Sequence, residues 1–599
     1  MSEYWFEEET LVTKFLWKTI LRVIKIVMNQ KTLLILFLAS TILMGVNIGI
    51  EIIIVKQLVD LGIIPGNIEM VGLYIILFGI NWVGWIILAY LMIYCGARLG
   101  NHLLYNLRKQ IFEHIQDLSF SYFDKTPVGW IMARIISDAN TVSSTMMWSF
   151  RRVLQEGFVI ISSLFIIIII DWRLTLIVIA ILIVLLYVGL KFQRRILREN
   201  RKMRTINANI LRNLNENITG VRIVKSFLRE EESLADFAGL TEEMYRVSNK
   251  AVWYSAILTP MVRILYSIMF GLILWLGTFQ ITLGSFTIGS LQAFITVIIV
   301  TGNSMNALTI QYVEMQQSIA SAEKIFSLLD TQPDITDQPG SIENEKIKGD
   351  IIFENVSFYY TKKNPVLKDF SLKINPGETI ALVGPTGGGK TTIVNLICRF
   401  YEPKEGRIIL DGRDYKEYTL NFIQSRLGVV LQTPHLFAGS IMENIRYGRL
   451  NATDEEVYEA ARLAYADEFI IRLDQKYNAA VGEGGVLLSQ GQKQLISLAR
   501  ALLVKPDLVI MDEATSSVDS VTEKLIQKGI QSLLKDSTSF VIAHRLSTIK
   551  NADRILFIKD GEVREAGTHK ELINAKGFYY NLFTRQFRED REKELHIID

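Results

Sequence analysis

The chain has 599 residues, of which 50% are hydrophobic and 21% are charged. This length implies several domains, and so large an apolar share excludes an ordinary soluble protein, so part of the chain is expected in a membrane. The net charge of +2 gives no general attraction for nucleic acid, and no local basic patch compensates, so no nucleic-acid partner is expected.

Residues 1–31 are predicted to form an N-terminal segment at the inner face of the membrane. They mix aromatic residues with basic ones, among them Lys18, Arg22 and Lys25. This composition is typical of a helix that lies in the membrane interface. A helical lead-in to the first span explains the same pattern equally well.

Residues 32–329 are predicted to form an α-helical transmembrane domain with six spans. Six apolar runs each reach the roughly 20 residues that cross a bilayer. They cover residues 31–56, 71–95, 147–170, 173–192, 252–280 and 283–308.

The connections after the second and fourth runs are about fifty residues long and basic. The positive-inside rule therefore puts them, and both termini, in the cytoplasm. Because they are rich in helix-forming residues, we expect long helical arms that extend inward from the spans. Pro and Gly predict that the arms turn near residues 123–129 and 217–220.

Several charged residues fall inside the predicted spans. Arg151, Arg152 and Glu156 lie near the inner end of the third, where a structural role is favoured, whereas Glu51 in the first and Arg263 in the fifth stand out. A charge that faces lipid is costly, so both are expected to face the bundle interior or a water-filled cavity. They are candidates for the substrate cavity. An internal ion pair or a snorkelling side chain would account for them as well.

The remaining sequence divides into three parts by composition. Residues 330–349 are polar, contain Pro and Gly, and are predicted to be a linker. Residues 350–585 interleave strand and helix patterns, as in an α/β nucleotide-binding domain. Residues 586–599 are dense in charge and are expected to be a C-terminal tail.

A predicted phosphate-binding loop follows a strand-like run at 379–383 and precedes a helix-like run at 393–400. In such a loop the backbone N–H groups turn toward one anion at the positive end of the next helix. A lysine reaches the terminal phosphates and the threonine after it offers a hydroxyl to Mg²⁺, so the expected ligand is a nucleoside triphosphate. The loop consists of Gly384, Pro385, Thr386, Gly387, Gly388, Gly389, Lys390, Thr391 and Thr392.

Two further apolar runs end in residues suited to phosphate chemistry. Asp512 and Glu513 follow the run at 508–511, which has the form of a buried central strand. Asp512 is expected to hold hydrated Mg²⁺, and Glu513 to polarise the attacking water as a general base. His544 ends the run at 540–543, where its imidazole is expected to reach a γ-phosphate.

With these motifs the chain resembles the ATP-binding cassette family, specifically a half-transporter of the exporter type. Residues 488–492 are similar to the family signature and residues 516–519 to its D-loop. The resemblance implies that His544 is the switch histidine. It also implies ATP contacts from Tyr360, which would stack on adenine, from the Q-loop residue Gln432, which would also contact Mg²⁺, and from Ser489, Gln490, Gly491, Gln492 and Asp519.

The resemblance further implies a dimer that sandwiches two ATP molecules, switches a membrane cavity from inward to outward facing, and exports amphipathic drugs or lipids across a bacterial cytoplasmic membrane. Gln490 stands where the signature usually has glycine, and Gly388 where the phosphate loop often has serine. The first departure favours a heterodimer with a second half-transporter, in which this chain supplies Glu513 and His544. A homodimeric lipid flippase or a peptide exporter is the alternative, and an ATP-gated channel or regulator is a more distant one.

Overall fold

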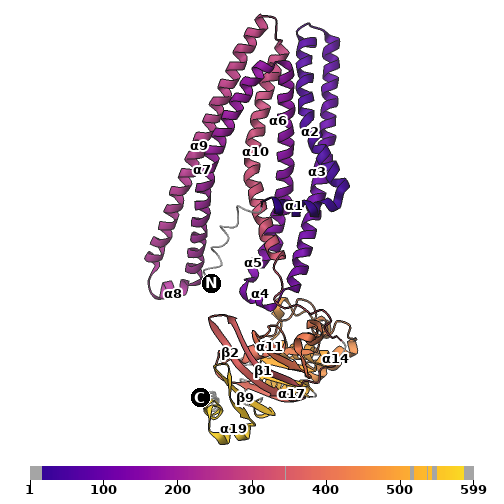
Figure 1. The fold of residues 1–599 in the computed structure, drawn as a ribbon, viewed down its shortest axis with the longest axis vertical. Helices are drawn as coiled ribbons and strands as arrows, with labels where there is room; N and C mark the ends of the chain where they lie inside the picture. The colour runs from indigo at the N-terminus through magenta and orange to yellow at the C-terminus, as the bar shows by residue number, and fades with distance from the viewer. Residues whose placement is uncertain (1–15, 344–345, 513–518, 536, 543–548, 586–599) are drawn as a thin grey trace. The chain divides into compact units, whose positions relative to one another are not determined.

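The computed structural model describes residues 16–343, 346–512, 519–535, 537–542 and 549–585 (Figure 1). The chain divides into two compact units. The first comprises Met1–Gln116 and Pro127–Thr331, and the second comprises Asp117–Thr126 and Gln332–Asp599. Residues 117–126 therefore belong to the second unit although they lie within the N-terminal half of the sequence.

The first unit is helical, and within the described residues six helical segments are long and apolar enough to span a membrane. This confirms the six predicted spans. The helices of the N-terminal region are α1 (Leu16–Val27), α2 (Lys31–Gln57), α3 (Ile68–Asp117), α4 (Phe120–Lys125), α5 (Val128–Ala133), α6 (Met147–Ile170), α7 (Trp172–Thr219), α8 (Val221–Ser226), α9 (Glu230–Thr282) and α10 (Ile288–Leu329).

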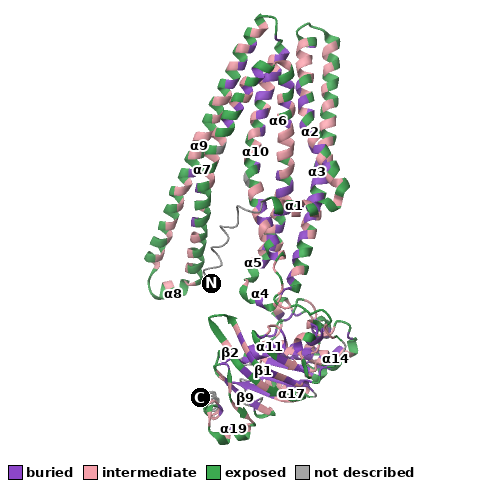
Figure 2. Ribbon diagram, viewed as in Figure 1, coloured by how far each residue is buried: buried purple, intermediate pink, exposed green. Residues whose placement is uncertain are grey.

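Helices α6 and α10 form the centre of the described bundle. Helices α7 and α9 pack along each other, α6 and α10 pack between the outer helices, and α2 packs mainly against α6, with α3 alongside it (Figure 1). Many apolar side chains of these helices are exposed (Figure 2). Exposed apolar residues on long helices suit a lipid environment, where burial inside the protein is not needed to remove them from water.

The long helices continue well beyond the length of a bilayer, as predicted for the cytoplasmic arms. Helix α9, with 53 residues, is about 80 Å long at 1.5 Å per residue. The first arm turns at Thr126 and Pro127, between α4 and α5, and the second at Gly220, between α7 and α8. Both turns lie inside the predicted ranges.

The predicted span ranges were approximate, and the start of the sixth differs from the helix that the structure shows. The sixth span was expected to begin at residue 283, but α10 begins at Ile288. Gly284 has a left-handed φ of +73°, which ends the helical path. Thr287 then caps α10 by accepting a hydrogen bond from the backbone N–H of Ser290, and a side-chain cap of this kind fixes a helix start.

The end of α10 is held by two other helices. Arg22 on α1 donates hydrogen bonds of 2.7 and 2.6 Å to the two carboxylate oxygens of Asp330. Its guanidinium also lies 4.4 Å from the ring centroid of Phe326. On α3, Nε2 of His114 lies 2.9 Å from the carbonyl oxygen of Thr331. The last residues of the first unit are thus tied to α1 and α3.

The second unit contains two β-sheets. A four-stranded antiparallel sheet has the order β2-β1-β4-β5, and a six-stranded sheet has the order β10-β9-β3-β8-β7-β6, with parallel pairing from β9 to β6. The strands are β1 (Ile351–Thr361), β2 (Asn364–Ile374), β3 (Thr379–Val383), β4 (Glu405–Leu410), β5 (Arg413–Asp414), β6 (Leu427–Val430), β7 (Leu508–Asp512), β8 (Thr538–Ile542), β9 (Arg554–Lys559) and β10 (Glu562–Gly567).

Helices cover the parallel sheet, and the two sheets share a core. Strands β3, β7 and β8 are almost wholly buried, as expected for central parallel strands. This confirms the α/β fold predicted for the C-terminal region. The helices are α11 (Lys390–Ile397), α12 (Leu420–Gln424), α13 (Ile441–Arg446), α14 (Asp454–Leu463), α15 (Asp467–Ile470), α16 (Gln490–Val504), α17 (Ser520–Leu534) and α19 (His569–Ala575).

Candidate functional site

The predicted phosphate loop connects β3 to α11, the strand, loop and helix context that the motif requires. Gly384 has φ of +141°, and a Cβ there would lie 2.0 Å from the carbonyl oxygen of Ile558. Gly389 has φ of +106° and forms the N-cap of α11. Both positions therefore require glycine, and the loop brings its backbone to the positive end of α11.

Lys390 opens α11 and folds back over the loop. Its Nζ donates hydrogen bonds of 2.8 and 2.9 Å to the carbonyl oxygens of Gly384 and Pro385. Burial lowers the pKa of Lys390, and the nearby carboxylate of Asp512, at the end of β7, opposes that shift. The ammonium of Lys390 thus lies beside the phosphate loop, near the start of α11 and the carboxylate of Asp512.

Tyr360, near the end of β1, lies beside this loop. Its hydroxyl is 3.3 Å from Oγ1 of Thr392 and accepts a hydrogen bond of 3.3 Å from Nδ2 of Asn395, both on α11. Its ring makes edge contacts with Phe358 and Tyr401, yet 41% of the residue remains exposed. An exposed aromatic ring next to a phosphate loop is suited to stacking on a nucleobase.

The signature residues lie at the start of α16. Ser489 is the N-cap: its hydroxyl accepts from the N–H of Gln492, and the Gln492 side chain accepts from the N–H of Ser489. Gly491 is buried and Gln490 is half-buried. This capping box orients the helix start, whose remaining N–H groups are free to meet an anion.

Asp519 caps the next long helix, α17. Its carboxylate accepts from the backbone N–H groups of Thr522 and Val521 at 2.9 and 3.2 Å. These hydrogen bonds lower the pKa of Asp519, so the side chain is ionised at neutral pH.

Two predicted catalytic residues, Glu513 and His544, lie outside the described residues. Residues 516–518 of the D-loop also lie outside them. Thr391 is exposed in the first turn of α11, and Gln432 is exposed just beyond β6. The structure therefore brings together the phosphate loop, Asp512 and Tyr360.

The two charged residues predicted for the substrate cavity are not paired with each other. Glu51 is half-buried on α2, and Arg263 is exposed on α9. Neither makes an ion pair with any residue in the described part of the chain. The polar contacts that do join spans include Asn47 with Asn81 at 2.9 Å and Ser304 with Glu156 at 2.7 Å.

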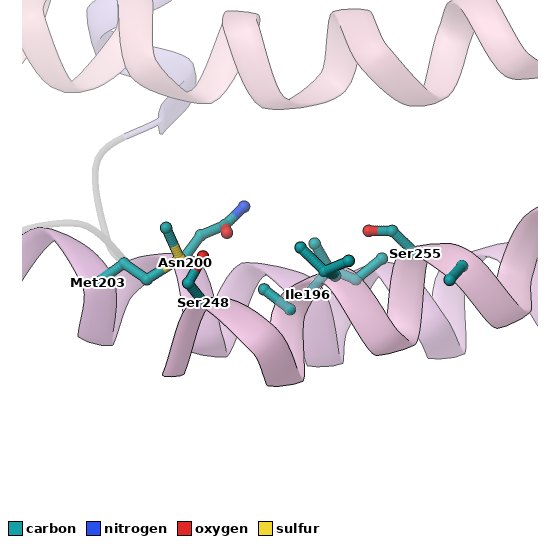
Figure 3. Close-up of a pocket in the computed structure, with 8 residues that line it drawn as sticks. Ile196, Asn200, Met203, Ser248 and Ser255 are labelled. Carbon is teal, nitrogen blue, oxygen red and sulfur yellow. The ribbon is translucent and has the colours of Figure 1, made fainter. Parts of the chain in front are cut away.

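A shallow hollow of about 500 Å³ lies along α7 and α9, between residues 196–203 and 248–256. Its lining side chains lie along one side of this helix pair (Figure 3). They are mostly small or apolar, and include Ile196, Met203 and Ser255.

The sequence interpretation missed the aromatic residues that follow α11. Phe400 stacks on Phe120 of α4 with ring centroids 4.3 Å apart, and the hydroxyl of Tyr401 donates to the carboxylate of Asp124. These partners are 277 or more residues apart in sequence. The only available indication was the adjacency of two aromatic residues to the phosphate-loop helix.

Comparisons with known proteins agree with this architecture. Residues 33–305 match the model of the ABC transporter transmembrane region, and residues 367–516 match the model described as ABC transporter. The chain is 36% identical over 594 residues to the ABC transporter ATP-binding protein YknV of Bacillus subtilis, covering 98% of this chain and 97% of the relative.

Two other relatives carry names that describe a transported compound. An ATP-dependent lipid A-core flippase of Syntrophus aciditrophicus is 36% identical, with coverage of 85% of this chain and 87% of the relative. A fatty acid ABC transporter ATP-binding/permease protein of Mycobacterium bovis is 37% identical, with coverage of 82% and 79%. The chain therefore belongs to the ABC transporter family, as a multi-pass membrane protein that carries the transmembrane region and the ATPase region of that family in one polypeptide.

Proposed function

We propose that this protein uses ATP hydrolysis to export amphipathic compounds, lipids or drugs, across a bacterial cytoplasmic membrane as one half of a dimer. The observation that carries the proposal is the position of Lys390 over a glycine-rich loop at the start of α11, in a chain that also has six candidate spans. A triphosphate-binding loop joined to a membrane bundle links nucleotide energy to movement across the bilayer.

Each nucleotide contact has a residue suited to it. The backbone of residues 384–389 and the start of α11 receive the phosphates, and Lys390 leaves its loop carbonyls to reach the terminal ones. Tyr360 stacks on adenine. The start of α16, with Ser489, Gln490, Gly491 and Gln492, contacts the γ-phosphate bound by the partner chain, and Asp519 lies in the segment that faces it.

Glu513 is proposed as the general base that orients the attacking water, and His544 as the residue that contacts the γ-phosphate. Both follow strands of the parallel sheet, β7 and β8, whose carboxyl ends lie at the same edge as the phosphate loop after β3. That edge is where ligands of such sheets bind.

The oxygen donors at this edge fit Mg²⁺. Thr391 presents an exposed hydroxyl in the first turn of α11, Asp512 places a carboxylate at the end of β7, and Gln432 is exposed beyond the neighbouring strand β6. Hard oxygen ligands completed by water and phosphate are what Mg²⁺ prefers. When bound, the ion would neutralise charge that develops on the β- and γ-phosphates.

The choice of amphipathic cargo rests on the relatives and on the spans. Two relatives are named for lipid A-core and fatty acid. The charged candidates for the substrate cavity are few, Glu51 and Arg263, so the spans offer little to a highly polar solute. This favours compounds that partition into the bilayer.

We further propose a heterodimer in which this chain contributes Glu513 and His544. Gln490 is half-buried at the first helical position of α16, so its side chain crowds the helix start that would bind phosphate. A partner with glycine at this position would complete the stronger of the two ATP sites.

Transport into inverted membrane vesicles tests the proposal. Vesicles that contain the chain, with and without a co-expressed half-transporter, would be supplied with MgATP and a nitrobenzoxadiazole-labelled phospholipid or a fluorescent amphipathic dye. ATP-dependent accumulation that is lost in Glu513→Gln is the expected result. The same panel without any ATP-dependent accumulation would refute export of amphipathic compounds.

A further inference from the structure

Helix α4, the turn of the first cytoplasmic arm, is anchored within the second unit by its side chains. Phe120 stacks on Phe400. The hydroxyl of Ser121 donates to Asp334, and the hydroxyl of Ser119, just before α4, accepts from the N–H of Ile335 at 3.1 Å. These contacts fix where α4 sits but do not involve the nucleotide site.

A fourth contact does lead to that site. The hydroxyl of Tyr401 donates to the carboxylate of Asp124 at the end of α4. The ring of the same tyrosine meets the ring of Tyr360 at nearly a right angle, 87°, with centroids 5.1 Å apart. The side chain of Tyr401 thus contacts both Asp124 of α4 and the ring of Tyr360, which is proposed to stack on the base.

Tyr360 is held on its other sides by the phosphate-loop helix and by its own strand. Its hydroxyl meets Thr392 and Asn395 of α11, and its ring contacts Phe358. Because the hydroxyl of Tyr360 is held by these contacts, its ring can respond to a stacked base mainly by tilting. A tilt of the Tyr360 ring changes its contact with the ring of Tyr401.

A cavity lies between α4 and the end of β1. It has a volume of about 620 Å³ and is lined by residues of both elements. Tyr401 borders this cavity and bridges it through its ring and its hydroxyl.

The Tyr401 hydroxyl stays protonated and can therefore keep donating its hydrogen bond to Asp124. Burial raises the pKa of Tyr401, and the hydrogen bond to Asp124, the charge of that carboxylate, Tyr360 and Asp334 raise it further. The phenol therefore stays protonated across the physiological range, so the bridge does not depend on pH there.

We propose that Tyr401 is a positioning residue that joins the nucleobase position at Tyr360 to Asp124 of α4, so that a bound adenine, rather than the phosphates, restrains the membrane arm at residues 117–126. The inference rests on the proposed function, because it requires adenine to stack on Tyr360. The inference adds that adenine bound at Tyr360 restrains residues 117–126 of the same chain. This restraint needs no partner chain to close on the nucleotide.

Hydrogen–deuterium exchange on the full chain in lipid nanodiscs tests this. Exchange of residues 117–126 would be measured without ligand, with Mg²⁺ and the non-hydrolysable ATP analogue AMP-PNP, and with Mg²⁺ and tripolyphosphate. AMP-PNP should slow exchange of this segment at least twofold. Tripolyphosphate, which lacks a base, should leave it unchanged while still binding the phosphate loop.

Two variants separate the hydroxyl from the ring. In Tyr401→Phe the ring remains, so AMP-PNP should still bind but should lose most of its effect on residues 117–126. Asp124→Asn should cause a similar loss, and the double variant should be no worse than either single one. Tyr477→Phe is the matched control, because Tyr477 is buried and donates to Asp467 at 2.6 Å elsewhere in the same unit; its response to AMP-PNP should equal the parent's.

The possible results distinguish this inference from the proposed function. If AMP-PNP does not bind the parent, the proposed function fails and the inference with it. If it binds but leaves residues 117–126 unchanged, or if Tyr401→Phe or tripolyphosphate gives the same protection as the parent with AMP-PNP, the inference alone is overturned. A merely structural Tyr401 would alter exchange in the absence of ligand without changing the response to it.

Discussion

Replacing Lys390 with methionine should weaken ATP binding by an amount that the structure allows us to work out. An ammonium and a phosphate about 4 Å apart attract by about 4 kcal/mol at an effective dielectric constant near 20. Binding first breaks the two hydrogen bonds from Nζ to the carbonyls of Gly384 and Pro385, at about 1 kcal/mol each. The net loss in Lys390→Met is about 2 kcal/mol, which is about a 30-fold increase in Kd.

Methionine suits this test because it keeps the buried length of the side chain while removing the charge. Fluorescent ATP binding in nanodiscs would measure the Kd of the parent, of Lys390→Met and of a control, Lys570→Met, whose lysine is exposed in the first turn of α19. The control should bind like the parent. A change of less than threefold in Lys390→Met would refute the role given to the ammonium.

The pH dependence of binding provides a second check on the same residue. Because burial lowers the pKa of Lys390, its charge is lost on the alkaline side sooner than that of an exposed lysine. Affinity of the parent should therefore fall as pH rises through that lowered pKa. Lys390→Met should lack this fall, since it has no ammonium to lose.

Three other outcomes are expected. Glu513→Gln should keep ATP binding and lose most ATP turnover, and retained turnover would end its role as general base. Gln490→Gly should raise the ATPase rate of a heterodimer at its weaker site. An unchanged rate would refute the idea that the Gln490 side chain weakens that site. Burial lowers the pKa of His569, whose ring contacts the hydroxyl of Tyr579 at 2.8 Å. The stability this gives is fully present above the pKa of an unfolded histidine, about 6.5, and should be lost as pH falls from there through the lowered pKa of the folded state. Thermal melting of the parent should drop more steeply between pH 7 and 5 than that of His569→Gln; parallel curves would contradict this.

The features that sequence predicted well depend on neighbours in the chain. The phosphate loop needs only β3, glycines at positions with restricted space, and α11, all within a short stretch. The spans need only apolar length. The start of α10 was misplaced because an apolar count ignores the cap that Thr287 makes.

Features that depend on distant partners could not be predicted in this way. Tyr401 and Asp124 are 277 residues apart, and no local pattern marks either as the partner of the other. Likewise Glu51 and Arg263 were noticed because charges are rare in spans, but rarity alone says nothing about which helix face they occupy. Only the packed helices place one half-buried and the other exposed.

The contacts at the end of α10 have a mechanical consequence. A free helix end frays readily, because its last carbonyls lack partners. Here Arg22 grips Asp330 from α1, and His114 meets the Thr331 carbonyl from α3. A pull on the chain after Thr331 is therefore shared among three helices instead of unwinding one, so the segment that follows can transmit force without first extending the end of α10.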